Sequence, residues 1–518
     1  MQNAAISEHR IIWASNHNVI IISMTKIAII QLNPIPGDFD KSGAKILDAF
    51  NKIPDLDSWT EDDWIVFPFG ALSGFPLDDL RFNPGFVRAY KQAWEKVSKK
   101  LPLCKANLIF RHPGSPIDHR VLEYGKFRKE NDAVDYKILI ETNPVSFNIN
   151  PNQLIYTEFK NLCAERGKPG VFCNLVGGQD SLMFEGGSFV CNEKGQVIAS
   201  AKRWEEDIVI CSLDDAPIQV DVGASAIPSP EDKRLEDIYH ALTMGIKDYV
   251  EKNRFDGAVI GLSGGIDSAL VAALATAALG PNRVTAVTMP SQHTSYETLR
   301  DAKLLAVNLG LKLHSLPIKE PYDAFNNVLA PVLKQFDSQR DPQNLTDQNL
   351  QARIRGVYLM ALSNRTGRIV LNTSNKSEGS VGYGTLYGDL VGGLSVLIDL
   401  WKTDVWALSR WINKHAGKEI IPVSTIDRVP SAELRPHQED RHSIPDYPVL
   451  DPIMKMFVED EKSLEEIVAA GYNRSAVELA LKLYNRNEFK RRQCPPGLYL
   501  TSRPLAQKQR PMTSRFTE

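Results

Sequence analysis

The sequence has no apolar run that approaches the ~20 residues a helix needs to cross a bilayer. Its six cysteines, at positions 104, 163, 173, 191, 211 and 494, show no CxxC spacing, so neither a zinc site nor a disulfide framework is indicated. The charges nearly cancel, because 60 Lys and Arg residues stand against 63 Asp and Glu residues. This balance argues against a protein that mainly coats nucleic acid or an anionic membrane. These absences leave a soluble, cytoplasmic enzyme as the expected class.

The chain is too long for one hydrophobic core, since 518 residues usually divide into two or more domains. Residues 1–23 mix Ile and Val with Asn, His and Arg and lack a small-residue cleavage site, so they make a poor signal peptide. We interpret them as a disordered N-terminal extension and Met24 as a candidate start.

Residues 24–211 read as short apolar strands separated by loops and a few helices, which predicts an α/β sandwich. A hairpin is expected over residues 185–195. The other expected strands are 27–32, 64–67, 107–110, 137–140, 170–176 and 207–211, and the expected helices are 43–52, 86–101 and 153–166.

Residues 212–234 are rich in proline and acidic side chains, which is typical of a linker. From residue 235 to 518 helices and strands alternate, which predicts a doubly wound parallel sheet with ligands at the carboxyl ends of its strands. The expected strands are 258–261, 284–289, 312–317 and 368–373, and the expected helices are 235–253, 268–279, 296–309 and 350–364.

A glycine-rich loop lies between the strand 258–261 and the helix that follows it. Consecutive glycines let backbone amides approach an oxyanion, and the helix N-terminus adds partial positive charge. Asp267 would repel phosphate unless a cation lay between them, so it is a candidate Mg²⁺ ligand. The loop therefore predicts a nucleotide phosphate site formed by Gly261, Leu262, Ser263, Gly264, Gly265, Ile266, Asp267 and Ser268.

This loop is not a Walker A motif, because no Lys-Ser or Lys-Thr pair follows the glycines. It resembles the SGGxDS signature of ATP pyrophosphatases, which cleave ATP between its α and β phosphates. A plain Gly-Gly turn that caps a helix is the alternative, but the full string between a strand and a helix is much more specific.

Strings further along the chain resemble NAD synthetase in their order and at the intervals of that family. They lie at residues 349–356, 371–378, 382–383, 385–389, 431–434 and 487–493, so the resemblance covers essentially all of residues 235–518. The implied reaction is amidation of deamido-NAD to NAD. The nicotinate carboxylate attacks the α-phosphate of ATP and releases pyrophosphate, and ammonia then displaces AMP from the mixed anhydride.

The resemblance assigns Asn349, Glu378 and Lys490 to deamido-NAD, and Thr373 with residues 261–268 to ATP. Asp267 and Glu378 are assigned to Mg²⁺ as the catalytic carboxylates, and Lys402 to the ATP phosphates. Fixed cations suit a reaction that brings two polyanions together.

Other polar residues near these strings have simpler interpretations. Arg353 and Arg355 are expected to be solvated salt-bridge partners, and His293 a loop residue rather than a catalyst. Residues 490–492 fit either a basic surface patch or a substrate lid, and the chain context favours the lid.

Longer members of this family carry a nitrilase-like glutaminase in front, and residues 24–211 resemble it at 27–34, 66–68, 72–76, 176–180 and 184–190. Such a site needs a Cys nucleophile, a Glu base and a Lys for the oxyanion. This chain has Phe67-Pro68-Phe69 where the family has Phe-Pro-Glu. Residues 112–143 are also too short to hold the Cys and Lys segments, and no glutaminase triad is recognised.

The leading hypothesis is therefore an NAD synthetase that uses free ammonia and whose front domain is a structural or oligomerisation remnant. Glutamine use through an unrecognised nucleophile or a separate partner is one alternative. A non-catalytic nucleotide-binding regulator is another. The expected partners are deamido-NAD, ATP, ammonia or glutamine, and a second copy of the chain.

Overall fold

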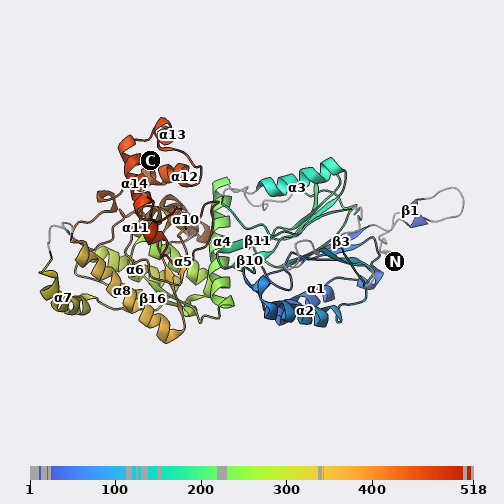
Figure 1. The fold of residues 1–518 in the computed structure, drawn as a ribbon, viewed down its shortest axis with the longest axis horizontal. Coiled ribbons are helices and arrows are strands. Elements are labelled where there is room, and N and C mark those ends of the chain that lie inside the picture. The colour runs from blue at the N-terminus through green and yellow to red at the C-terminus, as the bar shows by residue number, and fades with distance from the viewer. Residues whose placement is uncertain are drawn as a thin grey trace. The chain divides into compact units, whose positions relative to one another are not determined.

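The structure, a computed structural model, describes residues 11–12, 20–21, 25–111, 119–123, 126–129, 138–149, 153–218, 230–336, 341, 344–505 and 510–514. The chain forms two compact units, and each is described by itself (Figure 1). Unit 1 comprises Met1–Val145, Asn152–Gly177 and Phe184–Ile227, and unit 2 comprises Ser146–Pro151, Gly178–Met183 and Pro228–Glu518. No helix among the described residues is long and apolar enough to span a membrane.

Two main sheets form the core of unit 1, and the order in the larger one is β14-β3-β4-β5-β6-β7. Its strands are Asp207–Ser212, Lys26–Gln31, Trp64–Val66, Asn107–Arg111, His119–Glu123 and Lys126–Lys129, in that order. The smaller sheet has the order β13-β12-β9-β8, with strands Val197–Ser200, Phe189–Cys191, Gly170–Phe172 and Leu139–Glu141. The helices are α1 (Phe39–Asn51), α2 (Pro84–Ser98) and α3 (Gln153–Arg166).

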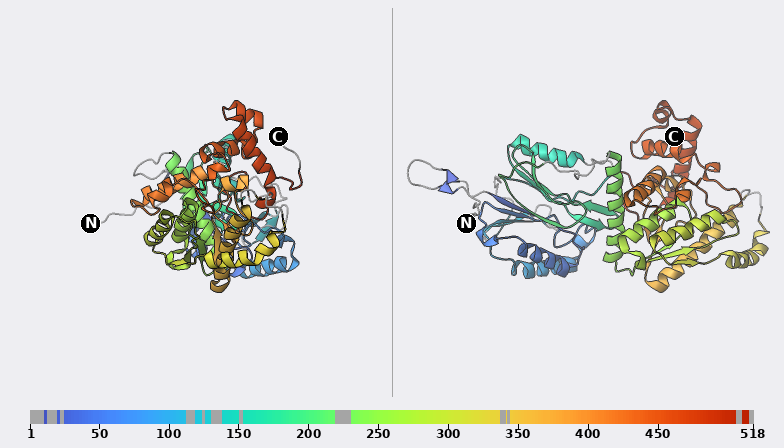
Figure 2. Two further views of the ribbon diagram at one scale, coloured as in Figure 1. Left: turned by 90° about the vertical axis from the view of Figure 1, so that its left-hand side faces the viewer. Right: turned by 180° about the vertical axis from the view of Figure 1, so that it is seen from behind.

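The side-chain alternation of β3 shows how the layers of unit 1 pack. Ile27 and Ile29 face the smaller sheet, where they meet Val171 and Val190, while Ala28 and Ile30 face α1 and α2. Because successive side chains of a strand point to opposite faces, one strand serves two cores. The helix α3 covers the outer face of the smaller sheet, and the α-β-β-α layering is visible in Figures 1 and 2. The predicted α/β sandwich is confirmed.

Unit 2 is built on a parallel five-stranded sheet with the order β17-β16-β15-β18-β19. The strands are Leu313–Ser315, Val284–Thr288, Ala258–Gly261, Ile369–Asn372 and Leu394–Ser395. Helices cover both faces of the sheet, as Figure 2 shows, and the chain passes from β15 to opposite edges, which makes the carboxyl end of β15 the switch point. The predicted doubly wound sheet is confirmed.

The helices of unit 2 follow in chain order. The apolar α5 is buried for most of its circumference, as expected for a helix that lies between the sheet and other helices. The helices are α4 (Pro230–Lys252), α5 (Ile266–Leu279), α6 (Tyr296–Leu309), α7 (Lys319–Leu333), α8 (Leu345–Thr366), α9 (Lys376–Val381), α10 (Lys402–Ala416), α11 (Val423–Asp427), α12 (Tyr447–Val458), α13 (Leu464–Ala469), α14 (Arg474–Arg486) and α15 (Glu488–Arg491).

Two short strand pairs and four 3₁₀ turns complete the elements of the described residues. The strands β1 (Ile11–Ile12) and β2 (Ile20–Ile21) pair with each other, as do β10 (Val176–Gln179) and β11 (Leu182–Glu185). The short 3₁₀ turns are Leu56–Ser58, Leu80–Phe82, Pro281–Arg283 and Asp440–His442.

A buried ion cluster ties the C-terminal segment of unit 2 to α9. The Lys376 side chain is fully buried, and its Nζ lies 2.7 Å from Asp399 and 2.8 Å from Glu459. Asp399 also accepts hydrogen bonds from the amides of Leu500 and Thr501, each 2.7 Å long. Removing one member would leave an uncompensated buried charge, which typically costs about 3–5 kcal/mol.

The structure differs from the sequence predictions at some boundaries. The predicted linker 212–234 runs too far, because α4 already begins at Pro230, and proline is favourable in the first turn of a helix. The helix α7 was not predicted, since Pro321 and Pro331 interrupt its pattern. Two segments within 24–211 belong to unit 2, where Ser181 accepts a hydrogen bond from the Tyr499 amide. Apart from β1 and β2, the predicted extension lies outside the described residues, as do residues 219–229 of the linker.

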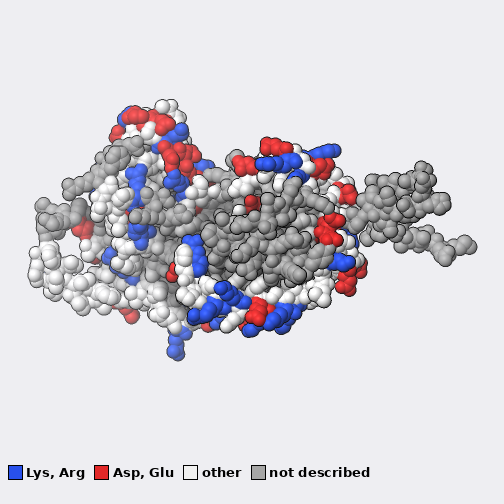
Figure 3. Space-filling model, turned by 45° about the vertical axis from the view of Figure 1, so that its right-hand side comes forward, with Lys and Arg blue, Asp and Glu red and all other residues white. Residues whose placement is uncertain are grey.

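Figure 3 shows one face of the molecule with its charged side chains. Lys and Arg side chains are interspersed with Asp and Glu, and part of the described surface carries neither. On this face no large area of one sign appears among the described residues. The distribution agrees with the near-zero net charge, and it gives no support for a nucleic-acid surface there.

Candidate active site

The phosphate loop connects β15 to α5 at the switch point of the unit 2 sheet. Gly264 has φ +86°, and a Cβ atom there would lie 2.3 Å from the Thr298 carbonyl oxygen, so only glycine fits. Ser263 Oγ lies 3.1 Å from Ser268 Oγ and accepts a hydrogen bond from the Gly265 amide. No side chain caps the first turn of α5. Its free amides and dipole therefore suit a phosphate group, as predicted.

Two carboxylates and one ammonium lie beside this loop. Lys402, the first residue of α10, donates from Nζ to Asp267 Oδ2 at 2.5 Å and to Glu378 Oε1 at 3.2 Å. The Asp267 and Glu378 side chains are each 17% exposed, whereas that of Lys402 is 2% exposed. The structure thus brings together three of the predicted site residues from three helices. Lys402 bonds the two carboxylates, although the resemblance assigned it to the ATP phosphates.

The electrostatics of this cluster favour binding of a further cation. Burial raises the pKa of Glu378, and the nearby charges of Asp267 and Asp440 add to that rise. Burial alone would lower the pKa of Lys402, but the Asp267 and Glu378 carboxylates outweigh burial and raise it. Three carboxyl groups therefore lie near a single ammonium, and the raised pKa of Glu378 shows that ionising all of them is unfavourable without a further cation.

The carboxylates of the cluster suit Mg²⁺, but they do not complete its coordination. Mg²⁺ is usually held by one or two carboxylates together with substrate phosphates and water, and Asp267 and Glu378 supply the two carboxylates. Among the described residues, no group of three or more His, Cys, Asp and Glu side chains is arranged to hold a metal ion. The residues present therefore fit a metal that arrives with a phosphate ligand.

Asn375 also belongs to this cluster, and it was not predicted as a site residue. It is fully buried, precedes α9, and donates from Nδ2 to Asp267 Oδ1 at 2.8 Å. Its Oδ1 accepts from the Glu378 amide at 2.9 Å, which completes a capping box with Glu378. The Asn-x-x-Glu spacing at residues 375–378 was a usable signal for that cap. The bond to Asp267 joins residues 108 positions apart, so no local pattern could indicate it.

The residues assigned to deamido-NAD border the loop at residues 382–389. Asn349, on α8, accepts a hydrogen bond of 2.8 Å from the Thr385 hydroxyl. Lys490, on α15, donates to the carbonyls of Gly382 and Gly384, each at 2.8 Å, and burial lowers its pKa. Both side chains thus hold the same loop. Thr373 follows β18 directly, next to the residues that lead into α9.

Several simpler interpretations are settled by the structure. Arg355 donates to the Met289 carbonyl and burial lowers its pKa to about 10, so its interpretation as a solvated arginine is wrong. Arg353 is exposed and donates to the Leu386 carbonyl. His293 lies in a turn, as expected for a loop residue. Arg491 is buried and bonds Glu488, so residues 490–492 do not form a simple surface patch.

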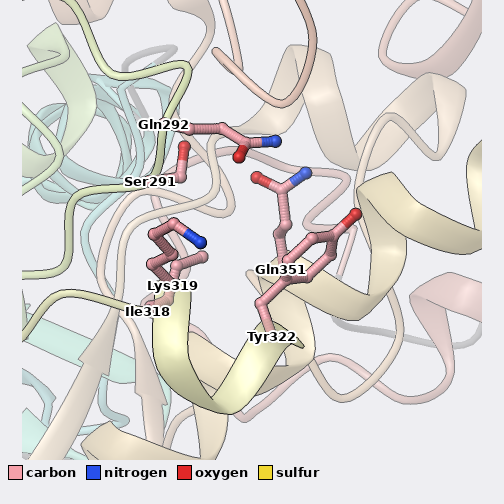
Figure 4. A pocket seen from close by; sticks show the side chains of 6 residues that line it. All are labelled: Ser291, Gln292, Ile318, Lys319, Tyr322 and Gln351. Carbon is pink, nitrogen blue, oxygen red and sulfur yellow. The ribbon is translucent and has the colours of Figure 1, made fainter. Parts of the chain in front are cut away.

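A small hollow of about 10 Å³, room for roughly one water molecule, lies beyond the carboxyl ends of β16 and β17. Figure 4 shows the Lys319 ammonium and the Gln351 amide turned toward the space between the lining residues. A space of this size is too small for a substrate. The lining residues, none of which was predicted, are Ser291, Gln292, Ile318, Lys319, Tyr322 and Gln351.

Aromatic side chains occupy the position in unit 1 where a glutaminase would carry its base. Phe69 lies edge-on to Phe75 with ring centroids 5.7 Å apart, and Phe75 lies edge-on to Phe184 at 6.1 Å. None of these side chains can accept a proton. Aromatic packing therefore occupies the position at which the resemblance would place a glutamate base.

The thiols of unit 1 are poorly suited to nucleophilic attack. Cys163, Cys173 and Cys191 are fully buried, and Cys211 is 7% exposed. Burial raises the pKa of Cys211 to about 12 and also raises that of the half-buried Cys104. A thiolate nucleophile needs access and a lowered pKa together. No cysteine of unit 1 combines them.

Comparison with known proteins identifies the family. A family model described as NAD synthase matches residues 238–494. Glutamine-dependent NAD(+) synthetase from Thermotoga maritima is 34% identical to this chain, over 95% of this chain and 99% of its own. The chain belongs to the NAD synthetase family. NAD synthetases are ligases, and the similarity extends through both units of the two-domain type.

Solved structures of NAD synthetases agree with this assignment. Glutamine-dependent NAD+ synthetase from Acinetobacter baumannii, in complex with adenosine diphosphate, is 30% identical, covers 94% of this chain and 98% of its own, and has a TM-score of 0.67. The enzyme from Cytophaga hutchinsonii has a TM-score of 0.77 at 17% identity over 95% of this chain and 98% of its own, which shows the shared fold alone. The predicted resemblance and the predicted fold class are confirmed.

Proposed function

We propose that this NAD synthetase amidates deamido-NAD with ATP in unit 2 and releases AMP and pyrophosphate. The observation that carries the proposal is the Asp267–Lys402–Glu378 cluster beside an uncapped helix N-terminus. It provides a phosphate cradle next to carboxylates and a buried ammonium, which is what adenylation of a carboxylate requires.

The side chains of the cluster act by position and charge rather than by covalent attack. The amides of residues 261–268 would bind the phosphates of ATP, and Lys402 would offset charge as pyrophosphate leaves. Asn349, Glu378 and Lys490 are proposed to border deamido-NAD, with Thr373 on the ATP side. Asp267 and Glu378 would hold Mg²⁺, which when bound neutralises developing phosphate charge.

Two nitrogen donors are considered, and different observations favour each. The printed names of the full-length relatives favour glutamine, since they are called glutamine-dependent NAD(+) synthetases. The residues of unit 1 favour free ammonia, because Phe69 replaces the base and the thiols are buried or raised in pKa. We propose ammonia as the donor for the purified chain acting alone, with glutamine as the second candidate.

The decisive experiment supplies ammonium or glutamine as the sole nitrogen source and follows NAD and pyrophosphate. We expect turnover with ammonium and none with glutamine, and a thiol-reactive glutamine analogue should leave ammonium-driven turnover intact. Glutamine-driven turnover that disappears when one of Cys104, Cys163, Cys173, Cys191 or Cys211 is replaced would establish the glutamine candidate. The absence of turnover with either donor, despite ATP binding, would support a non-catalytic regulator.

We also propose that the chain self-associates through an exposed apolar stripe on α7. Phe325, Val328 and Val332 follow one another at helical spacing, and Phe336 continues the line beyond the helix. They are 48%, 75%, 52% and 69% exposed. Monomers rarely expose a contiguous apolar patch larger than roughly 300–600 Å². A Val332→Glu variant should lower the mass measured by light scattering, whereas Asn327→Glu should not, and an unchanged mass for Val332→Glu would remove this surface from consideration.

A further inference from the structure

Asn375 makes contacts that join the two proposed metal ligands. Its Nδ2 donates to Asp267 Oδ1 at 2.8 Å, and its Oδ1 accepts from the Glu378 amide at 2.9 Å. Since Asp267 lies in the first turn of α5 and Glu378 in the first turn of α9, one side chain couples two helices that follow neighbouring strands.

The orientation of the Asn375 amide is set by its partners. A backbone N–H can only donate, so the atom that faces the Glu378 amide must be the oxygen. The NH₂ group therefore faces Asp267, whose carboxylate can only accept when it is ionised. A flipped amide would place an oxygen against the carboxylate and a donor against a donor.

The Asp267 carboxylate is consequently held at both of its oxygens. Oδ1 receives the Asn375 amide and Oδ2 receives Lys402 Nζ. Two fixed donors on different oxygens restrict rotation of the carboxylate, and the capping box holds the first turn of α9 that carries Glu378. Asn375 itself is fully buried, so bulk solvent does not reach its amide.

We propose that Asn375 is a positioning residue that sets the Asp267 carboxylate relative to Glu378 and thereby the Mg²⁺ dependence of ATP binding. The inference rests on the roles proposed above for Asp267 and Glu378. Residues that orient metal ligands typically contribute about 10–100-fold in metal affinity or activity when they are changed. The proposed role requires the hydrogen bond that the Asn375 side chain donates to Asp267. The cap that the same side chain provides for α9 is not sufficient.

Two substitutions separate the donor from the cap. Serine and aspartate are as good as asparagine at an N-cap, so both Asn375→Ser and Asn375→Asp keep the bond to the Glu378 amide. Serine is too short to donate to Asp267, and aspartate can donate only while it is protonated, so once ionised it removes the bond and adds repulsion. Serine leaves a small void, whereas aspartate keeps the volume and adds a charge.

The matched control is Asn473→Ser on α14. Asn473 caps that helix by accepting from the amides of Ser475 and Ala476, and it is exposed. The same substitution there tests an N-cap outside the site. It should leave the Mg²⁺ response unchanged.

The experiment measures ATP binding by calorimetry over a series of Mg²⁺ concentrations, without deamido-NAD, on the full chain. We expect both Asn375 variants to need about 10–100-fold more Mg²⁺ for half-maximal ATP binding. The melting temperature of Asn375→Ser and the Mg²⁺-free ATP affinity of both variants should stay close to those of the unaltered chain, whereas the added buried charge should lower the melting temperature of Asn375→Asp. A normal Mg²⁺ response in both variants would overturn the proposal.

Further outcomes are equally decisive. A loss confined to Asn375→Ser would show that volume matters rather than the donated bond, and a loss confined to Asn375→Asp would show that the added charge matters, so each would overturn the proposal. Asp267→Asn serves as the reference. If Asp267→Asn changes the Mg²⁺ response and the Asn375 variants do not, only this inference fails. If Asp267→Asn changes nothing, the proposed role of Asp267 fails as well.

Discussion

The strand β15 in unit 2 and the strand β4 in unit 1 both have parallel neighbours, but they end differently. Polar and charged side chains follow β15, whereas aromatic side chains follow β4. In unit 2 the loop after β15 leads to Asp267, which meets an amide and an ammonium. In unit 1 the chain after β4 continues into Phe67 and Phe69, which pack against other aromatic rings. Yet β3 and β4 are as well buried as the strands of the other sheet. A fold is therefore maintained by its core, and the chemistry of its strand ends can be replaced independently.

The largest expected effect comes from removing charge in unit 2. Asp267→Asn is nearly isosteric, but it loses the anionic partner of Lys402 and a proposed Mg²⁺ ligand. We expect kcat to fall by about 10²-fold or more, the scale of one lost electrostatic stabiliser. Pyrophosphate release with ATP, deamido-NAD and ammonium measures it. Asp48→Asn, at an exposed ion pair with Lys52 in unit 1, is the control and should be neutral. Near-normal turnover of Asp267→Asn would contradict its assigned role.

A smaller effect is expected from Lys490→Ala. The Lys490 ammonium holds the carbonyls of Gly382 and Gly384, and bonds to charged groups contribute about 1.5–3 kcal/mol. We expect KM for deamido-NAD to rise by about tenfold or more, with a much smaller change for ATP. Separate titrations of the two substrates test this, with the exposed Lys482→Ala on α14 as control. Equal losses for both substrates would indicate general disruption of the C-terminal segment.

The smallest effect on turnover is expected from a substitution that introduces a carboxylate in unit 1 where the family has its glutamate base. Phe69→Glu should create no glutamine-driven activity and leave ammonium-driven turnover within about twofold, because no accessible thiol is available to use the base. A carboxylate placed beside Phe75 should lower the free energy of unfolding by about 1–3 kcal/mol, measured by denaturant titration. Phe69→Leu provides the apolar control. Glutaminase activity in Phe69→Glu would show that unit 1 still holds a nucleophile.

Local patterns in the sequence predicted most elements and the phosphate loop. Helices 153–166 and 296–309 match α3 and α6, because their apolar periodicity is uninterrupted. The glycines of residues 261–268 fixed the loop by their spacing between a strand and a helix. Such patterns depend only on residues that are close together in the sequence.

Contacts between distant residues could not be read in the same way. The bond between Asn375 and Asp267 depends on two strands lying side by side, and the partners of Lys402 depend on where α10 begins. Arg355 shows the reverse error, since its helical position suggested solvent while the tertiary structure half-buries it and bonds it to the Met289 carbonyl. Charge and polarity alone do not say which face of a helix is covered.

The buried Lys376 cluster has a consequence for the order in which the chain becomes folded during synthesis. Asp399 receives the amides of Leu500 and Thr501, so this charged centre lacks a full set of partners until almost the whole chain has been made. Unit 1 ends at Ile227 and can complete its own packing long before that. A chain cut short before Leu500 would therefore contain every residue of the first unit but lack these partners of Asp399 in the second.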